Sequence, residues 1–158
     1  RPDLVVEPWV ADELVVFCAP AHPLAQQGRA TLAELGQQSW IVREPGSGTR
    51  ETLDQALRHH HSALPIRLEL EHTEAIKRAV EFGLGIGCIS RLALREAFRR
   101  GSLVAIETPE LDLRRHFHFL WHRRKFQTAG MREFIALCRT MTAGVERSDQ
   151  IEWSIMRD

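Results

Sequence analysis

The sequence is poor in cysteine, and its cysteines follow none of the patterns of a disulfide framework or a zinc site. Cys18, Cys88 and Cys138 lie far apart in the 158-residue chain, each among apolar residues, and no C-x-x-C pair occurs. Disulfide frameworks and zinc sites use paired, closely spaced cysteines, so we expect three buried, reduced thiols. Reduced thiols are typical of cytoplasmic proteins, and we expect this protein to be cytoplasmic.

Long apolar runs and an excess of charge are also missing. No uninterrupted apolar stretch approaches the roughly 20 residues needed to cross a bilayer, and no charged-then-apolar leader opens the chain. We therefore expect neither a membrane partner nor export. Lysine and arginine together number 21, as do aspartate and glutamate, which gives a formal net charge of zero. Without a basic surplus, the chain itself is expected to bind nucleic acid poorly.

Sequence motifs of the common enzyme classes are absent. The chain has no G-x-x-x-x-G-K-[ST] or G-x-G-x-x-G nucleotide motif, no G-x-S-x-G nucleophile turn and no H-E-x-x-H metal motif. Its serines, cysteines and histidines form no local arrangement of nucleophile and base. We therefore expect a protein that is not an enzyme and needs no cofactor, and we assign neither catalytic residues nor metal ligands.

What the sequence does contain is an alternation of β-branched runs and helical patterns, with 44% hydrophobic residues to supply a core. The alternation predicts an α/β fold with a largely parallel sheet. Strand-like runs cover residues 14–19, 40–42, 66–70, 84–89, 103–106 and 116–122. Helical patterns cover residues 32–35, 49–60, 73–82, 92–98 and 128–142. From Gly144 onward the pattern weakens into a charged tail, apolar enough to dock through Ile151, Trp153, Ile155 and Met156.

A glycine-rich turn between a strand and a helix is the most suggestive stretch. Residues 43–50 read REPGSGTR, so a helix is expected to start near Gly46, Ser47, Gly48 and Thr49. The backbone N–H groups of a helix start are unpaired and carry the positive end of the helix dipole, so they can hold a carboxylate, sulfate or phosphate. Ordinary capping and turn geometry explains the same residues, and both interpretations stay open.

Two other segments have a functional and a structural interpretation. Residues 71–74 (EHTE) form a second strand-to-helix turn, in which Thr73 is more simply explained as a helix N-cap than as a ligand contact. Residues 83–87 (GLGIG) predict a strand whose backbone is approached closely by another group. That group is either a ligand in a crevice or a neighbouring helix.

Three histidines share one face of the strand expected at 116–122. His116, His118 and His122 alternate with aromatic residues, and imidazoles at this spacing can ligate zinc. A solvated polar face opposite a buried aromatic face explains the pattern better, because no carboxylate lies between the histidines. A metallohydrolase built on this face is therefore a minor alternative.

The order of several segments resembles that of LysR-type transcriptional regulators. The family's "HPLA" strand and turn is matched by LVVFCAPAHPLA at residues 14–25. At family-like spacing there follow TLAEL at 31–35, WIVREPGSGTR at 40–50, EAIKRAV at 74–80, GLGIGCIS at 83–90, GSLV at 101–104 and a closing helix with Phe134 and Ile135. The chain is identified as most of the effector-binding region of such a regulator, with the likeness covering roughly residues 4 to 142.

The resemblance implies an α/β fold like that of type 2 periplasmic binding proteins, with two Rossmann-like lobes and a small, anionic effector in the cleft between them. Residues 1–28 and 116–143 would belong to the first lobe, 29–115 to the second, and 144–158 to a C-terminal tail. Ligands of open α/β sheets sit at strand carboxyl ends beside helix starts, which agrees with the turns described above. The cleft would be lined by Ala19, His22, Gly46, Ser47, Gly48, Thr49, His72, Thr73 and Gly87.

The family's N-terminal parts have no counterpart in this sequence. LysR-type regulators carry a winged helix-turn-helix and a linker helix, and their first lobe opens with further strands and helices. We expect this sequence to be a truncated piece of a dimeric regulator, with an incomplete first lobe and with DNA contacted only by the missing segment. An incomplete lobe would expose sheet edges and apolar area, so self-association into a homo-oligomer is expected. The solute-binding lobe of a transporter shares the fold and stays open as an alternative.

Overall fold

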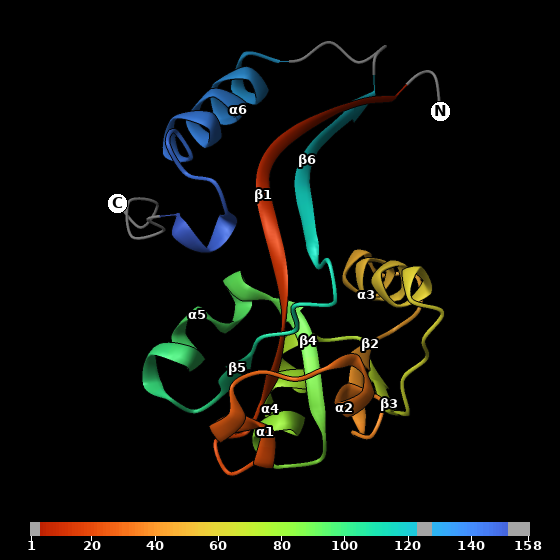
Figure 1. Cartoon of the computed structure of the whole chain (residues 1–158). Coiled ribbons are helices and arrows are strands. Elements are labelled where there is room, and N and C mark those ends of the chain that lie inside the picture. Colours follow the sequence, from red (N-terminus) through yellow and green to blue (C-terminus); the bar gives the residue numbers. More distant parts are fainter. Residues whose placement is uncertain (1–3, 123–127, 152–158) are drawn as a thin grey trace. The chain divides into compact units, whose positions relative to one another are not determined.

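Strands and helices alternate along most of the chain, as the sequence pattern predicts. The computed structural model describes residues 4–122 and 128–151 (Figure 1). The strands are β1 (Leu4–Cys18), β2 (Trp40–Arg43), β3 (Ile66–Leu70), β4 (Ile86–Ser90), β5 (Val104–Ile106) and β6 (Arg114–His122). The helices are α1 (Pro23–Gln27), α2 (Leu32–Leu35), α3 (Gly48–His59), α4 (Thr73–Glu81), α5 (Arg91–Arg100) and α6 (Ala129–Met141), followed by a 3-10 turn, η1 (Ser148–Gln150).

The chain divides into two compact units. The larger unit comprises residues 13–114, and the smaller unit comprises residues 1–12 together with 115–158. The chain passes from one unit to the other twice, once within β1 and once at the start of β6. Residues 13–28 pack with the larger unit, whereas the sequence analysis assigned them to the first lobe. The assignment of lobes stays a prediction.

The sheet is mixed rather than largely parallel. Its strand order is β3-β2-β4-β1-β5, and β6 pairs with β1 outside this path. Strand β2 runs parallel to both β3 and β4, as predicted for βαβ connections. Strand β1 runs antiparallel to β4 and β5, with Leu14 opposite Ser90 and Val16 opposite Ile106. The parallel part is therefore confined to the three strands that precede α3, α4 and α5.

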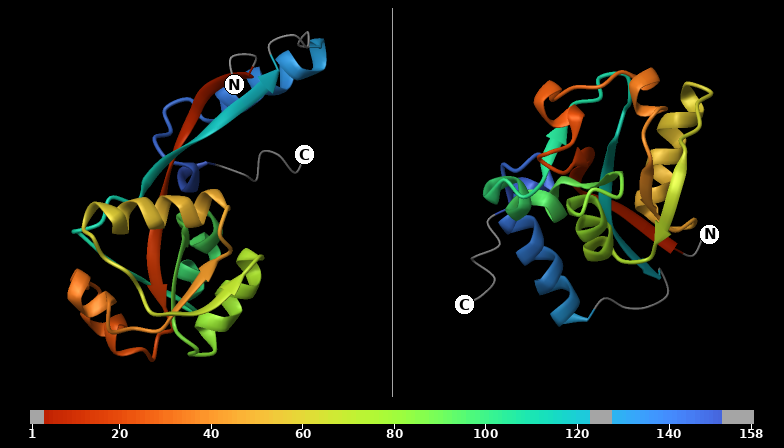
Figure 2. Two further views of the ribbon diagram at one scale, coloured as in Figure 1. Left: turned by 90° about the vertical axis from the view of Figure 1, so that its right-hand side faces the viewer. Right: turned by 90° about the horizontal axis from the view of Figure 1, so that it is seen from below.

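Helices cover both faces of the sheet in the larger unit (Figure 2). Successive residues of β1 point to opposite faces, because strand side chains alternate. Leu14, Val16 and Cys18 pack with α1, α2 and α3, whereas Val15 and Phe17 pack with α4 and α5. A strand buried on both faces reads as a continuous apolar run, which is why residues 14–19 are a clear strand in the sequence.

Helix boundaries follow the capping chemistry, with one correction. The Ser47 hydroxyl accepts a hydrogen bond from the Arg50 amide and caps α3, and Gly101 ends α5 in the left-handed conformation. The prediction that Thr73 is an N-cap is wrong. His72 has the extended backbone of the N-cap and Thr73 is the first helical residue of α4. Its hydroxyl contacts Arg43 instead.

The smaller unit departs most from the sequence-based expectation. Strand β1 begins at Leu4, well before the strand predicted at residues 14–19, although Pro8 lies inside it. Trp9 stacks on Phe119 of β6, with 5.1 Å between ring centroids, and its indole N–H donates to Thr142. The apolar pattern of residues 128–142 predicts an amphipathic helix, but in α6 only Cys138 is buried, and Phe134 is 56% exposed.

The three cysteines are free and buried, as predicted. Burial raises the pKa of the Cys18 thiol to about 11 and also raises the pKa of Cys138. Both thiols therefore stay protonated and unreactive near neutral pH. Cys18 and Cys88 belong to the apolar core on the α3 face of the sheet, where they act as small hydrophobic residues.

Close packing explains the glycines of the 83–87 segment. A side-chain carbon at Gly85 would meet the Ser39 carbonyl oxygen at 2.5 Å, and one at Gly87 would meet the Phe17 ring at 2.9 Å. The close approach predicted from the sequence is therefore present. At Gly87 it comes from buried side chains, Phe17 and Val80, and Gly87 itself is buried.

Replacing Gly87 by alanine should destabilise the larger unit. The added methyl must displace a rigid aromatic ring in a close-packed core, so we expect Gly87→Ala to lower the free energy of unfolding by about 1–3 kcal/mol in urea denaturation. Gly36→Ala is the matched control, because its added carbon would lie 3.5 Å from the nearest atom and its φ of −66° suits alanine. Equal midpoints for the two variants would show that the packing at Gly87 is not as close as described.

Candidate functional site

The carboxyl ends of β2, β3 and β4 lie at one edge of the sheet in the larger unit. The three strands are parallel and end at Arg43, Leu70 and Ser90. Each is followed by a helix, so α3, α4 and α5 all begin at this edge. The structure therefore brings together two of the predicted segments, residues 46–49 and 72–73. We call this the carboxyl edge.

The helix starts at the carboxyl edge differ in how they are capped. The hydroxyls of Ser47 and Ser90 accept hydrogen bonds from the amides of Arg50 and Leu92. Within the described part of the chain, His72 makes no side-chain capping hydrogen bond at α4. The first-turn N–H groups of α4 thus lack the hydroxyl partner that the other two helices have, and they are suited to an anionic partner.

A basic side chain reaches across this edge to α4. Arg43, the last residue of β2, has one guanidinium nitrogen 3.4 Å from the Thr73 hydroxyl and another 2.8 Å from a Glu44 carboxylate oxygen. Its side chain is half-buried. The guanidinium therefore lies beside the uncapped helix start, where it adds positive charge and planar hydrogen-bond donors that suit a carboxylate or phosphate.

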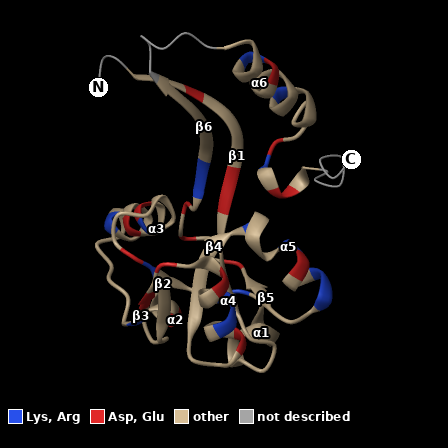
Figure 3. Cartoon of the chain, turned by 180° about the vertical axis from the view of Figure 1, so that it is seen from behind, with Lys and Arg blue, Asp and Glu red and all other residues tan. Residues whose placement is uncertain are grey.

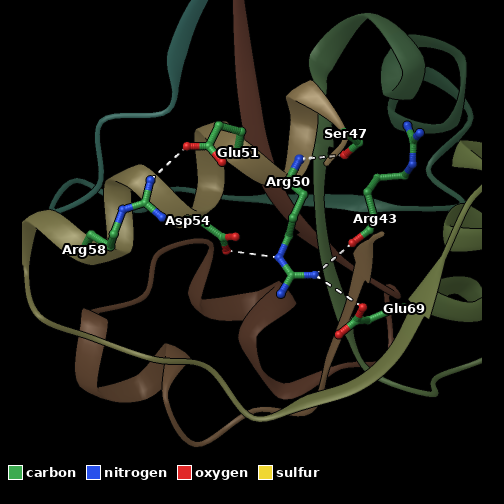
Figure 4. Close-up of polar contacts among 7 residues, drawn as sticks. All are labelled: Arg43, Ser47, Arg50, Glu51, Asp54, Arg58 and Glu69. Carbon is green, nitrogen blue, oxygen red and sulfur yellow. Dashed lines mark hydrogen bonds and ion pairs between the residues drawn. The ribbon is translucent and has the colours of Figure 1, made fainter. Parts of the chain in front are cut away.

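Arg50 fixes the start of α3 to the ends of two strands (Figure 4). Its guanidinium donates to the Arg43 carbonyl at 3.0 Å and to Asp54 at 3.0 Å, and lies 3.7 Å from Glu69 of β3. Its backbone amide donates to Ser47. The Arg50 side chain is 12% exposed and thus largely shielded from water, whereas the Asp54 and Glu69 side chains are 33% and 42% exposed. Arg50 thereby holds the Ser47 turn in place while pointing away from it.

A further ion pair lies at the carboxyl edge. Glu13 of β1, next to the residue opposite Ser90, forms an ion pair with Arg91 at 2.8 Å. Arg43, Arg50 and Arg91 each contact a carboxylate, so the edge has basic groups without a large positive surplus. An anion that binds here would therefore have to replace Glu44 or Glu13 as the partner of an arginine. This favours a small ligand with one anionic group over a polyanion.

Ala19 and His22 lie at the other edge of the sheet. Strand β1 is antiparallel to β4 and has Phe17 opposite Gly87, so its carboxyl end lies beside the amino ends of β2 and β4. His22 caps α1 by accepting a hydrogen bond from the Leu24 amide. The structure therefore does not bring these two predicted residues to the carboxyl edge.

The glycines of the predicted site have different environments. Gly46 has a φ of 95°, a left-handed conformation that shapes the turn before α3, and Gly48 is the first residue of that helix. Gly87 is buried beneath Phe17 and Val80, away from the carboxyl edge. Gly46 and Gly48 thus belong to the candidate site, whereas Gly87 has a packing role.

Two hollows of the larger unit are lined partly by residues 109–114, and a third, of 290 Å³, lies between α4 and α5. One of 660 Å³ lies between α3 and residues 109–114, and it includes His59, His60 and Asp112. The other, of 280 Å³, lies between β1 and the same segment, and it reaches the carboxyl edge through Glu13 and Arg91. A hydrogen bond from Arg114 lowers the pKa of Asp112 to about 2, so this carboxyl group is ionised. None of these hollows is lined by Ser47, Thr49 or Thr73.

The histidines of β6 form no metal site in the part of the chain that is described. His116 and His118 are exposed, with 6.3 Å between ring centroids, and the His122 side chain lies outside the described residues. Across residues 4–122 and 128–151, no group of three or more His, Cys, Asp or Glu could hold a metal ion. No described helix is long and apolar enough to span a membrane.

Sequence comparison assigns the family. The profile described as "LysR substrate binding domain" matches residues 1–143. The chain belongs to this family. A relative is the HTH-type transcriptional regulator YeiE of Escherichia coli K12, which is 42% identical over 136 residues, or 86% of this chain and 46% of YeiE. This LysR substrate binding domain thus spans about half the length of the curated relatives it matches.

Solved structures of regulatory domains share the fold. The regulatory domain of CcmR from Synechocystis PCC6803, solved in complex with 2-PG, is 28% identical, with a TM-score of 0.82 over 92% of this chain and 70% of that one. The effector binding domain of QuiR, solved with shikimate, is 19% identical, with a TM-score of 0.80 over 92% of this chain and 68% of that one, and shows the fold alone. The predictions of an α/β fold and of a LysR regulatory domain, which belongs to a family of non-enzymatic transcription regulators, are confirmed.

Two residues of this LysR substrate binding domain were not among the predicted site residues. Arg43 and Arg50 flank the glycine-rich turn, and from the sequence alone they are only part of its REPGSGTR motif. A usable signal was present, because an arginine that ends a strand and another in the first turn of the next helix are both placed near that helix start. Which of them contacts Thr73 and which contacts Glu69 depends on the strand order.

Loss of the Arg50 contacts should destabilise the domain more than loss of an exposed ion pair on the same helix. Arg50→Gln removes the hydrogen bonds of a largely buried guanidinium to a carbonyl and a carboxylate, so we expect the free energy of unfolding to fall by about 1.5–3 kcal/mol. The control is Arg58→Gln, whose side chain is 61% exposed and pairs with Glu51; it should cost at most about 1 kcal/mol. Similar losses in chemical denaturation would contradict the anchoring role of Arg50.

Proposed function

We propose that this domain senses a small, anionic metabolite for a dimeric LysR-type regulator that contacts DNA through a helix-turn-helix segment outside this sequence. The metabolite binds at the carboxyl edge, where the hydroxyls of Ser47, Thr49 and Thr73 and the N–H groups of two helix starts face it. The observation that carries this proposal is the convergence of α3, α4 and α5 at one edge, with Arg43 beside the uncapped start of α4. Helix dipoles and hydrogen-bond donors at one point favour an anion.

The relatives support the proposal. CcmR, at 28% identity, has a regulatory domain of the same fold in complex with 2-PG, and YeiE is an HTH-type transcriptional regulator. We infer that the two compact units correspond to two Rossmann-like lobes, the smaller of which is incomplete. A ligand that contacts both lobes would favour one arrangement over another only by its difference in affinity for the two.

Substitutions at the carboxyl edge test the site. In the full-length regulator we expect Thr73→Ala and Thr49→Ala, each losing a hydroxyl, and Arg43→Gln, losing a charge, to weaken effector binding by about 10-fold or more. The measurement is isothermal titration calorimetry after a thermal-shift screen of 2-PG, inorganic phosphate and inorganic sulfate. Thr52→Ala on the same helix is the control, because its hydroxyl donates to the Gly48 carbonyl within α3.

The outcome separates two failures. Unchanged effector affinity in all three variants would show that the effector binds at a place other than the carboxyl edge. Binding of zinc, with none of the anions stabilising the protein, would contradict the anionic effector and favour a metal-binding protein.

An apolar hollow in the smaller unit supports self-association. It measures 490 Å³ and lies between β6 and α6, where Leu120, Met131 and Phe134 are exposed. Apolar surface of this kind is a common protein interface, so we propose that the domain forms a homo-oligomer through it. The sequence also predicts self-association, because the unit that contains this hollow is proposed to be an incomplete lobe.

Polar substitution of this surface should therefore yield monomers. We expect light scattering to show an oligomer for the unsubstituted chain, and a Phe134→Ser, Met131→Ser double variant to scatter as a monomer at the same concentration, because apolar contact area is lost. Phe82→Ser, at an exposed phenylalanine of the larger unit, is the control. A monodisperse monomer before substitution would contradict the proposal.

A further inference from the structure

The residues that follow the family match have a defined place in the smaller unit. The family profile ends at residue 143, and residues 145–151, here called the C-terminal segment, continue beyond it. Arg147 forms a parallel bridge with Ala11 of β1, and Ser148 and Ile151 are each 1% exposed. The C-terminal segment is therefore packed into the unit as part of its core.

Ser148 contacts a buried carboxylate. The Ser148 hydroxyl donates to one oxygen of Asp12 at 2.8 Å, and the Arg115 guanidinium donates to the other oxygen at 2.8 Å. Asp12 is 1% exposed. A buried carboxylate is tolerated only when charge and hydrogen bonds replace its lost water, so Asp12 depends on both partners.

The conformation of the C-terminal segment is held by its own contacts. The Gln150 side-chain carbonyl accepts hydrogen bonds from the amides of Glu146 and Arg147, and Arg147 forms an ion pair with Asp149 at 3.3 Å. Gly144, with a φ of 76°, makes the turn that leads into it. Ser148 is thus oriented towards Asp12 by local structure.

Asp12 and Arg115 lie where the chain changes units. Asp12 is the last residue of the smaller unit on β1, and Arg115 is its first residue on β6. Figure 3 shows an acidic stretch of β1 beside a basic stretch of β6, and the two strands pair. The Asp12–Arg115 ion pair therefore joins the two connections at the point where they leave the smaller unit.

We propose that the C-terminal segment is a positioning element of the sensor. Through Ser148 it holds Asp12 against Arg115, and so keeps β1 and β6 fixed to each other where both pass into the larger unit. If an effector bound to the larger unit acts on DNA through the smaller unit, β1 and β6 carry the change, and the segment maintains the response without touching the effector. The effect on DNA binding rests on the proposed function. The fixing of β1 to β6 rests only on the contacts described above.

The test compares Ser148→Ala with Glu146→Gln, an exposed neighbour whose backbone amide donates to the Gln150 side chain. In this chain, Ser148→Ala should make the amides of residues 9–12 and 115–118 exchange with deuterium about 10-fold faster, while β2 and β4 stay unchanged, because loss of one buried contact opens the structure locally. Glu146→Gln should exchange like the parent chain. If Ser148→Ala does not fold, Arg115→Lys tests the same contact from β6.

The second readout is coupling in the full-length regulator, with 2-PG as the probe. Ser148→Ala should change the affinity for 2-PG by less than about twofold, while the ratio of DNA affinities with and without 2-PG falls towards one. Unchanged deuterium exchange in both β1 and β6 overturns the inference. Faster deuterium exchange with an unchanged ratio of DNA affinities also overturns it, because the segment would then only stabilise the smaller unit. If the parent regulator shows no response to 2-PG, the proposed function fails for that ligand, and unchanged exchange still overturns the holding of β1 to β6.

Discussion

The parallel alignment of β2, β3 and β4 is the constraint on which the candidate site depends. Because the three strands run in one direction, their carboxyl ends coincide, and the helices that follow them begin side by side. Their unpaired N–H groups and dipoles then converge, together with Arg43 and the hydroxyl of Thr73. Arg50 keeps the first helix in register with two of these strands. No single residue makes the site, and its chemistry results from the topology.

Local sequence signals predicted the elements of the larger unit well, and for a physical reason. Strands such as Ile66–Leu70 combine β-branched or apolar residues with flanking turns, and Ser47 and Gly101 mark helix ends by chemistry that acts over a few residues. The direction of β1 was not predictable in this way, because pairing between Leu14 and Ser90 is a long-range choice. It is this direction that separates Ala19 and His22 from the carboxyl edge.

The smaller unit was predicted less well because its elements depend on distant partners. Pro8 weakens the strand pattern in the amino half of β1, because proline is disfavoured within strands. This half is stabilised by pairing with β6 and by the stacking of Trp9 on Phe119. The helix pattern of α6 was recognisable, but its apolar face is largely exposed, so periodicity alone overstated its burial. Ser148 carries no sequence signal of its role, since its partner Asp12 is 136 residues away.

The most direct test of the central claim is an NMR titration of the isotope-labelled chain with 2-PG and with inorganic sulfate. A ligand at the carboxyl edge should perturb the amides of Ser47 to Thr49 and of Thr73 to Ala75, because their N–H groups would become hydrogen-bond donors to it. The amides around His22, at the opposite edge, should not move. Perturbation confined to the His22 turn or to the β6 histidines would contradict the account.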